Sequence, residues 1–549
     1  MVVEESESFY KEFSEKILEK RKSKAKVIFF CLVGSHSFNL NVETSDKDYF
    51  GVFLADIEDV LSGNMNTMVM DDHDPDYVLF EAERFCELLY KGNPKLVEPL
   101  FVNHYCYTAP EWLEIYRQRQ KFISQSVCYH YISYSKSQLG DARKADTSEN
   151  SNLNSNHSQF KKLYHTIRLL EETKRMLKGQ EPLVFLQGDI REKIMNIRMG
   201  RCDFNETLKE IDQLFIETES TLATVKETNS LPRSCNIQLL SSWLVNIRLN
   251  HIKSLDQTDL FSEDQLVLKN ENKLDIVSKC EQLMKNYSID GKLLFLSESG
   301  SKLHGLRSEN KSNDWIGVYV SKTSQYVSLY PDPNRVDLNT IRDVTKSKLE
   351  VTVDQSTLQR DTYVNGIQLF EISYFLSLLA SGNHRAVEVV LPLPNNSNIV
   401  QLQSEAWKSL MSLNGQYLQT NLIHHCWGVS QGQLAKSKAM VDKDFQQSRI
   451  NLSHAWRLVN RSEQVLDHNQ YSLVPNENEF QQILNIRDSD SMSKEQFTIL
   501  QKQCADQIQS VSNKLSKLSI SSVKEKKLSE QSLKQLYKTW LIKLRKSYL

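Results

Sequence analysis

The sequence carries the same set of motifs twice, in the same order along the chain. Residues 33–54, "VGSHSFNLNVETSDKDYFGVFL", align with residues 298–320, "ESGSKLHGLRSENKSNDWIGVYV", and two glycines match at one constant offset. A repeat of this kind predicts two structural units of the same plan. It constrains the fold more than any single motif does, because each unit must build a core of its own.

Two further blocks indicate the same duplication. Residues 76–101 align with residues 366–391, and residues 164–177 align with residues 453–466. The chain therefore reads as a tandem duplication of a unit of roughly 250–290 residues. The earlier unit is called copy 1 below, and the later unit copy 2.

Each copy is predicted to be an α+β unit in two parts. β-branched and aromatic runs of strand length occur at residues 26–33, 46–55 and 76–82, and an amphipathic helix at 84–92 ends in Gly-Asn-Pro. The second part of each copy has mostly helical periodicity. The predicted α+β and helical domains cover residues 1–115 and 116–255 in copy 1, and residues 256–400 and 401–549 in copy 2.

Composition and charge are those of an ordinary folded protein. Hydrophobic residues make up 40% of the chain and charged residues 25%, and the formal net charge is −2, so nucleic acid can be bound only by a local patch. The cysteines are scattered without CxxC spacing, which predicts reduced thiols in a cytosolic or nuclear compartment. No stretch is apolar enough to predict a membrane span or membrane partner.

Asp46 and Asp48 are candidate metal ligands. They are two residues apart on a predicted strand, so alternation places both carboxylates on the same face. Two such charges repel each other without a cation, and Mg²⁺ prefers carboxylate and phosphate oxygens. The alternative is the solvated edge of a hairpin, because a pair of this kind is common at the start of a strand.

Gly34 and Ser35 suggest a partner for such a metal. A glycine at the end of a strand lets the backbone approach a phosphate, and the Ser35 hydroxyl and the amides of a following helix can then donate to it. The combined pattern predicts a nucleoside triphosphate lying between the Gly-Ser turn and the Asp pair. Two metal ions can hold the attacking and leaving oxygens of a phosphoryl displacement.

These motifs resemble the DNA polymerase β-like nucleotidyltransferase superfamily. The segments "GSHSFNL" and "SDKDYFGVFL" are most similar to its branch of RNA-ligase-associated nucleotidyltransferases, as are "FEAERFCELLYKGNPKLVEPLF", "KKLYHTIRLLEE", "IMNIRMG" and "LPRSCN". The resemblance covers most of residues 25–250 and, in weaker form, residues 290–500. It implies a minimal nucleotidyltransferase sheet followed by a helical domain, and transfer of an NMP from an NTP with Mg²⁺ or Mn²⁺.

The resemblance also implies roles for individual residues. Gly34 and Ser35 would hold the β- and γ-phosphates, and Asp46 and Asp48 would hold the metals. Asn39 stands where the pattern usually has glycine. Asparagine tolerates a left-handed backbone better than most residues, so we expect the turn to survive.

The third carboxylate has two candidates, Asp76 and Glu81. Copy 2 has Gly366 in place of Asp76 but keeps Glu371 in place of Glu81. If copy 2 no longer catalyses a reaction, a catalytic residue should be lost there together with its partners, whereas a structural residue should be kept. This favours Asp76 as a metal ligand and Glu81 as a brace or cap of the following helix. The acid-rich stretch around Asp76, "MDDHDPDY" at 70–77, is predicted to be a loop turn.

Several basic residues of the helical domain are further candidates. Lys161 and Lys162 are interpreted as phosphate contacts, with a solvated basic face as the alternative. His165 and Arg168, which copy 2 retains, are expected to form a structural hydrogen-bonding pair at the domain junction. The basic C-terminal tail is either a solvated helix face or a contact with RNA phosphate.

Two functions from different classes fit the sequence. In the first, copy 1 is an enzyme that transfers an NMP to an acceptor hydroxyl, weakly favoured to be an RNA end, and releases pyrophosphate. Copy 2 is degenerate, because Ser312 replaces Asp46 while Asp314 keeps the place of Asp48. In the second, both copies are sensors or scaffolds that bind nucleotides or RNA ends with little catalysis.

Overall fold

The protein is described from a computed structural model. It covers residues 6–63, 65, 67–102, 104–146, 153–268, 275–300, 303–306, 314–336, 366–391, 402–413, 418–468, 473–489, 491–517 and 519–549. The chain forms two compact units. One consists of Met1–Asp256 with the short segment Val327–Tyr330, and the other of Gln257–Tyr326 with Pro331–Leu549.

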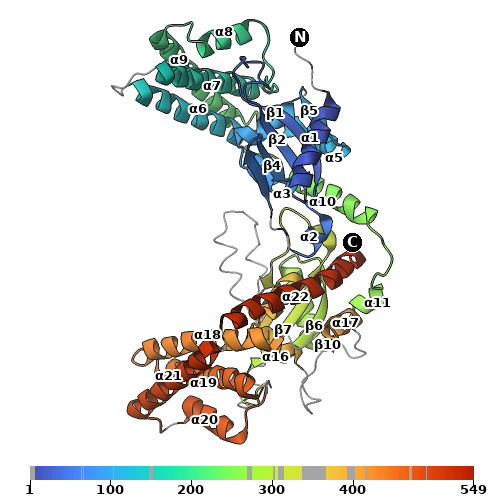
Figure 1. Ribbon diagram of the computed structural model, residues 1–549, viewed down its shortest axis with the longest axis vertical. Helices are drawn as coiled ribbons and strands as arrows, with labels where there is room; N and C mark the ends of the chain where they lie inside the picture. Colours follow the sequence, from blue (N-terminus) through green and yellow to red (C-terminus); the bar gives the residue numbers. More distant parts are fainter. Residues whose placement is uncertain are drawn as a thin grey trace. The chain divides into compact units, whose positions relative to one another are not determined.

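Copy 1 begins with a five-stranded mixed sheet, in the order β3-β4-β2-β1-β5 (Figure 1). β1 pairs antiparallel with β2 and β5, β2 pairs parallel with β4, and β3 pairs antiparallel with β4. The strands are β1 (Lys26–Val33), β2 (Asp48–Leu54), β3 (Val69–His73), β4 (Asp76–Glu81) and β5 (Cys106–Thr108). Because β1 reverses into β2, the C-terminal end of β1 meets the N-terminal ends of β2 and β4 at one end of the sheet.

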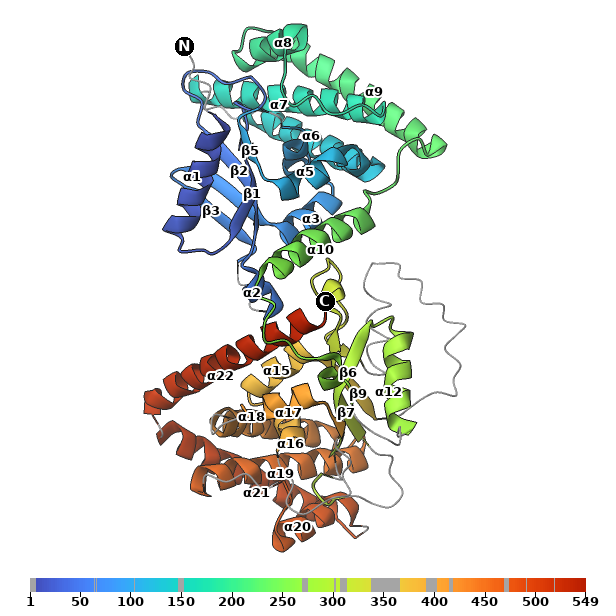
Figure 2. The same ribbon diagram turned by 90° about the vertical axis from the view of Figure 1, so that its right-hand side faces the viewer.

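Helices cover both faces of this sheet (Figure 2). α1 (Glu7–Lys20) packs on one face through Tyr10, Ile17 and Leu18. The opposite face is covered by α3 (Ala82–Tyr90), α5 (Pro110–Arg117) and α10 (Ile237–Ser254). Shorter elements connect these layers: α2 (Ile57–Leu61), α4 (Pro94–Val97), η1 (Glu98–Phe101) and η2 (Arg119–Phe122).

The helical part of copy 1 is a bundle of helices (Figure 1). They are α6 (Gln125–Asp146), α7 (Leu153–Leu177), α8 (Gly188–Arg198) and α9 (Phe204–Thr228). α10 does not continue the bundle. It returns to the sheet, where Trp243 packs against Trp112 of α5 and donates to the carbonyl of Glu111 at 2.9 Å.

Copy 2 repeats this topology strand for strand. Its sheet has the order β10-β6-β7-β9-β8, with the same parallel and antiparallel pairs. The strands are β6 (Gly291–Ser299), β7 (Asp314–Ser321), β8 (Arg335–Val336), β9 (Ile367–Glu371) and β10 (Leu402–Gln403). α12 (Asp275–Asn286) covers one face, and α15 (Ile372–Ala380), α17 (Glu405–Met411) and α22 (Ser519–Ser547) cover the other. The bundle is α18 (Leu418–Met440), α19 (Phe445–His468), α20 (Glu477–Asp488) and α21 (Lys494–Lys517), with α11 (Glu263–Leu266), α13 (Thr323–Tyr326) and α16 (His384–Val390) as connections.

The two cores share individual contacts as well as topology. Phe29 stacks on Trp112 with ring centroids 4.3 Å apart, and Phe295 stacks on Trp407 at the same separation. Gly51 of β2 lies against Leu79 of β4, where a Cβ would come within 2.6 Å of the leucine. Gly317 meets Leu369 at the same distance. The predicted duplication and α+β fold are therefore confirmed in detail.

One local prediction was wrong. Part of the acid-rich stretch 70–77 is strand rather than loop: β3 pairs with β4 and forms the edge of the sheet. The end of the basic C-terminal segment is helical, and its apolar face, with Trp540, Leu541 and Leu544, is buried in the core of copy 2. No helix among the described residues is long and apolar enough to cross a membrane.

Candidate active site

Asp48 and Asp76 lie side by side at one end of the first sheet. Asp48 is the first residue of β2 and is paired with Val33, the last residue of β1. Asp76 is the first residue of β4, and the parallel register of Tyr49 with Tyr77 sets the two aspartates next to each other. The topology thus brings together residues that are far apart in the sequence.

The electrostatics of Asp48 show which charges surround it. Partial burial raises the pKa of Asp48, and the carboxylates of Asp76 and Asp46 raise it further. The charges of Lys161 and His36 act in the opposite direction. Asp46 and Asp76 are exposed, whereas Asp48 is half-buried. This end of the sheet therefore concentrates negative charge, with two basic groups facing it.

Asp46 does not lie on the strand, contrary to the prediction. β2 begins only at Asp48. The preceding chain is held in a turn, in which the amide of Ser45 donates to the carbonyl of Val42 and the amide of Val42 donates to Ser45 Oγ, both at 2.9 Å. Strand alternation therefore does not place the carboxylates of Asp46 and Asp48 on one face.

Gly34 brings the backbone against the Asp48 carboxylate. It has a φ of +66°, and a Cβ built on it would lie 2.8 Å from Asp48 Oδ2. Only glycine fits this backbone conformation and this spacing without strain. The residues that follow form a turn over 34–39 instead of the predicted helix, closed by the amide of Phe38 on the carbonyl of Gly34 at 3.2 Å. The Ser35 hydroxyl has no hydrogen-bond partner among the described residues.

Asn39 preserves the turn in place of glycine, as expected. Its φ of +57° is left-handed, and its side-chain amide donates to the carbonyl of Leu186 at 3.0 Å. Arg191 of α8 donates to the carbonyl of Asn39 at 2.7 Å. In copy 2 the equivalent residue is Gly305, with a φ of +67°. The turn is thus fastened to the helical bundle.

The two candidate lysines have different surroundings in the structure. Lys161 is exposed on α7, and its charge acts on Asp48. Lys162 instead forms an ion pair with Asp141 of α6, at 3.7 Å. His36 was missed by the sequence reasoning, although it is part of the "GSHSF" motif. Its Nε2 lies 3.4 Å from the carbonyl oxygen of Ser45.

Glu81 caps α3, as one of the two sequence readings expected. One carboxylate oxygen accepts from the amide of Glu83 at 2.6 Å, and the other pairs with Arg248 of α10 at 3.1 Å. Copy 2 has the same arrangement, with Glu371 capping α15 and paired with Arg545. Glu81 is fully buried at the far end of β4 from Asp76. The geometry therefore leaves Asp76 as the carboxylate beside Asp48.

Arg168 and His165 do not bond to each other in the way the sequence suggested. The Arg168 guanidinium pairs with Glu98 at 2.9 Å and with Glu172, and it lies over the ring of Phe38. His165 stacks on Tyr164, and burial, followed by the charges of nearby arginine and lysine residues, lowers its pKa to about 3. In copy 2, Arg457 and Glu388 form the equivalent ion pair, at 2.7 Å.

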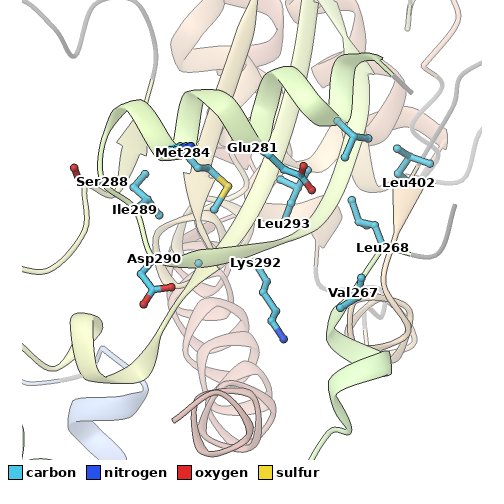
Figure 3. Close-up of a pocket in the computed structure, with 13 residues that line it drawn as sticks. Val267, Leu268, Glu281, Met284, Ser288, Ile289, Asp290, Lys292, Leu293 and Leu402 are labelled. Carbon is cyan, nitrogen blue, oxygen red and sulfur yellow. The ribbon is translucent and has the colours of Figure 1, made fainter. Parts of the chain in front are cut away.

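Copy 2 keeps the glycine turn and the counterpart of Asp48 but lacks the carboxylate that corresponds to Asp76. A Cβ on Gly300 would lie 2.5 Å from Asp314 Oδ2, as in copy 1, but Gly366 occupies the place of Asp76. Ser312 lies outside the described residues. A cavity of about 800 Å³ lies elsewhere in copy 2, between α12 and the edge of β6, lined by Met284, Ile289 and Leu293 among others (Figure 3). Its lining includes neither Gly300 nor Asp314, so we assign it no part in nucleotide chemistry.

The donors in copy 1 fit a hard cation held jointly with a substrate. Within the described ranges, no three His, Cys, Asp or Glu side chains converge closely enough to hold a metal by themselves. Carboxylates that crowd one another beside an open Gly-Ser turn nevertheless match the usual mode of Mg²⁺, which takes one or two carboxylates together with substrate phosphates.

A small mixed sheet followed by a helical bundle is the arrangement that the resemblance to the DNA polymerase β-like nucleotidyltransferases implies. The chain matches the model of one family over residues 10–236 and again over residues 271–536. It therefore belongs to the RNA repair pathway DNA polymerase beta family, and both copies carry the family domain. Comparisons with curated proteins and with solved structures found no match.

Proposed function

We propose that copy 1 transfers an NMP from an NTP to an acceptor hydroxyl, in a reaction that depends on Mg²⁺ or Mn²⁺ and releases pyrophosphate. The observation that carries this proposal is the position of Asp48. Its pKa is raised by the charges of Asp76 and Asp46, and its carboxylate lies against the backbone of Gly34. The family membership supports an RNA end as the acceptor.

The residues divide between metal, phosphate and acceptor. Asp46, Asp48 and Asp76 would hold the metal ions, which supply charge neutralisation of the phosphates when bound. Gly34 and the Ser35 hydroxyl face the β- and γ-phosphates, and Lys161 adds a positive charge.

The transfer step is an in-line displacement. The acceptor oxygen forms a bond to the α-phosphorus, and the bond from that phosphorus to the α,β-bridging oxygen breaks. Pyrophosphate leaves with the electron pair of the broken bond. Asp76 is exposed at the start of β4, and we assign it the proton of the acceptor hydroxyl.

A comparison of the two copies tests this proposal. The protein is incubated with α-labelled NTPs and with total cellular RNA and protein, and the fraction that carries label is identified. Asp48→Asn should reduce labelling at least about a hundredfold. Asp314→Asn, which changes the matching residue of copy 2, should leave it unchanged.

The sensor hypothesis predicts a different outcome. Wild type and Asp48→Asn would then bind NTP equally, and neither would release pyrophosphate with any acceptor. Loss of labelling in Asp314→Asn alone would assign the chemistry to copy 2 and contradict the proposal.

A further inference from the structure

Arg198 is a buried cation that has no carboxylate partner within the part of the chain that the structure describes. It is the last residue of α8 and is 9% exposed. Its guanidinium donates to two neutral hydroxyls, Tyr164 Oη at 3.2 Å and Ser45 Oγ at 3.0 Å, and it lies over the Tyr164 ring. Its Nε is buried and has no hydrogen-bond partner among the described residues.

The lack of a carboxylate partner, unlike the unpartnered Nε, is unusual among the buried arginines that the structure describes. A guanidinium stays charged, and burying it without a counter-charge is costly. Of the other buried arginines that the structure describes, only Arg449 lacks a carboxylate, and it donates to backbone carbonyls instead. The rest form ion pairs: Arg168, Arg248, Arg457, Arg461, Arg487 and Arg545.

The partners of Arg198 belong to the candidate active site. Ser45 directly precedes Asp46, and its carbonyl oxygen faces His36. Tyr164 lies close enough to the site for its pKa, raised mainly by burial, to be lowered by Arg198 and raised by Asp48. The charge of Arg198 thus lies against the turn that directly precedes Asp46.

Copy 2 shows the same arginine neutralised. Arg487 is the second-last residue of the equivalent helix, α20, and it donates from Nε and Nη2 to the carboxylate of the last residue, Asp488, at 2.6–3.0 Å. In copy 1 the residue after Arg198 is Met199, which is 46% exposed and uncharged. Both hydroxyl partners are also replaced in the sequence of copy 2, by Lys311 and Ser453.

We propose that Arg198 is a positioning residue that supplies uncompensated positive charge for the phosphate groups of the substrate, and that Asp488 has cancelled this charge in copy 2. The inference rests on the proposed function, because it needs a phosphate-bearing ligand at the Gly34 turn. The Arg198 guanidinium acts on the bound phosphate in two ways: its hydrogen bond holds Ser45 in place, and its positive charge attracts the phosphate across the site. The source of the phosphate is either the NTP or the end of an RNA.

A carboxylate placed after Arg198 tests the proposal without removing any of its hydrogen bonds. Met199→Asp copies the arrangement of copy 2 at an exposed position, and Met199→Asn is a neutral control of the same size. The probes are inorganic tripolyphosphate with Mg²⁺ and a 5′-phosphorylated oligoribonucleotide, with binding measured by calorimetry. Met199→Asp should weaken binding of at least one probe about tenfold, whereas Met199→Asn should bind like wild type.

The probe that is weakened identifies the source of the phosphate. Equal binding of both probes by the two Met199 variants would overturn the proposal. Arg198→Met, checked for folding by thermal unfolding, should weaken the same probe, and wild-type affinity in this variant would also overturn it. Failure of wild type to transfer label while Met199→Asp still weakens tripolyphosphate binding would reject the catalytic function alone.

Discussion

Asp48 and Asp76 are the first residues of two neighbouring parallel strands, and the charge of Asp76 raises the pKa of Asp48. A pair that must stay ionised to bind metal is therefore unfavourable for the folded protein on its own. The fold keeps the two groups together through the register of β2 and β4, which is fixed by buried residues farther along both strands.

Asp48→Asn should stabilise the metal-free protein while abolishing transfer. Because the folded-state pKa of Asp48 is raised, the folded protein loses stability as pH rises from the unfolded-state pKa through the folded-state pKa. Because Asp48 is only half-buried and solvent screens its charge, we expect a gain of no more than about 1 kcal/mol in the free energy of unfolding. Thermal unfolding with and without Mg²⁺ measures it. The gain should shrink with Mg²⁺, and an unchanged or lowered midpoint without metal would contradict the argument.

The roles of Asp76 and Glu81 can be separated by two substitutions. Asp76→Asn should abolish transfer with little change in stability, because Asp76 is exposed. Glu81→Gln should lower the stability of copy 1 by about 2–3 kcal/mol, because it removes a buried partner of Arg248, while the folded protein keeps its activity. Glu371→Gln is the matched change in copy 2. A fully stable but inactive Glu81→Gln protein would make Glu81 the third carboxylate.

Gly34→Ala should impair the site more than the fold. Gly34 and Gly179 both have left-handed φ values, +66° and +73°, so alanine costs about 1 kcal/mol at either position. Only at Gly34 does the new Cβ meet Asp48, because nothing lies within 4 Å of a Cβ at Gly179. Labelling assays should therefore show a loss of at least about tenfold for Gly34→Ala and none for Gly179→Ala. Equal activities would mean that Asp48 moves aside without consequence.

His165 should make the protein less stable as the solution becomes acidic. Its pKa falls from about 6.5 in the unfolded chain to about 3 in the fold, so stability is lost as pH falls from 6.5 toward 3. Between pH 6.5 and 5 the loss amounts to about 2 kcal/mol. His165→Phe keeps a ring against Tyr164 and should remove this part of the pH dependence. An unaltered pH dependence in this variant would show that His165 titrates normally.

Much of the fold was predictable because its signals are local or repeated. The apolar run 26–33 coincides with β1, and the repeat predicted a second unit with the same plan. β3 was missed because it is an edge strand in which only Met70 is buried, so its acidic residues read as a loop. α10 and α22 were assigned to helical domains because amphipathic spacing does not tell which surface a helix covers.

The site was predictable in part for the same reason. Asp48, Asp76 and Gly34 carry motif signals, whereas the split between Lys161 and Lys162 depends on how α7 packs against α6. Arg198 has no local signal at all. Its contact with Ser45 joins residues separated by 153 positions, and its significance appears only when Met199 is set beside Asp488.

Because α10 and α22 pack on sheets whose strands precede them in the sequence, each sheet can be fully covered only late in translation. Each sheet is made early in its copy, yet one of its faces stays partly bare until the whole bundle and then the closing helix have been translated. A nascent copy that ends before this helix exposes Phe85 and Trp112, or Phe375 and Trp407, to solvent and to chaperones. Each copy can therefore become a finished folding unit only when its last helix leaves the ribosome.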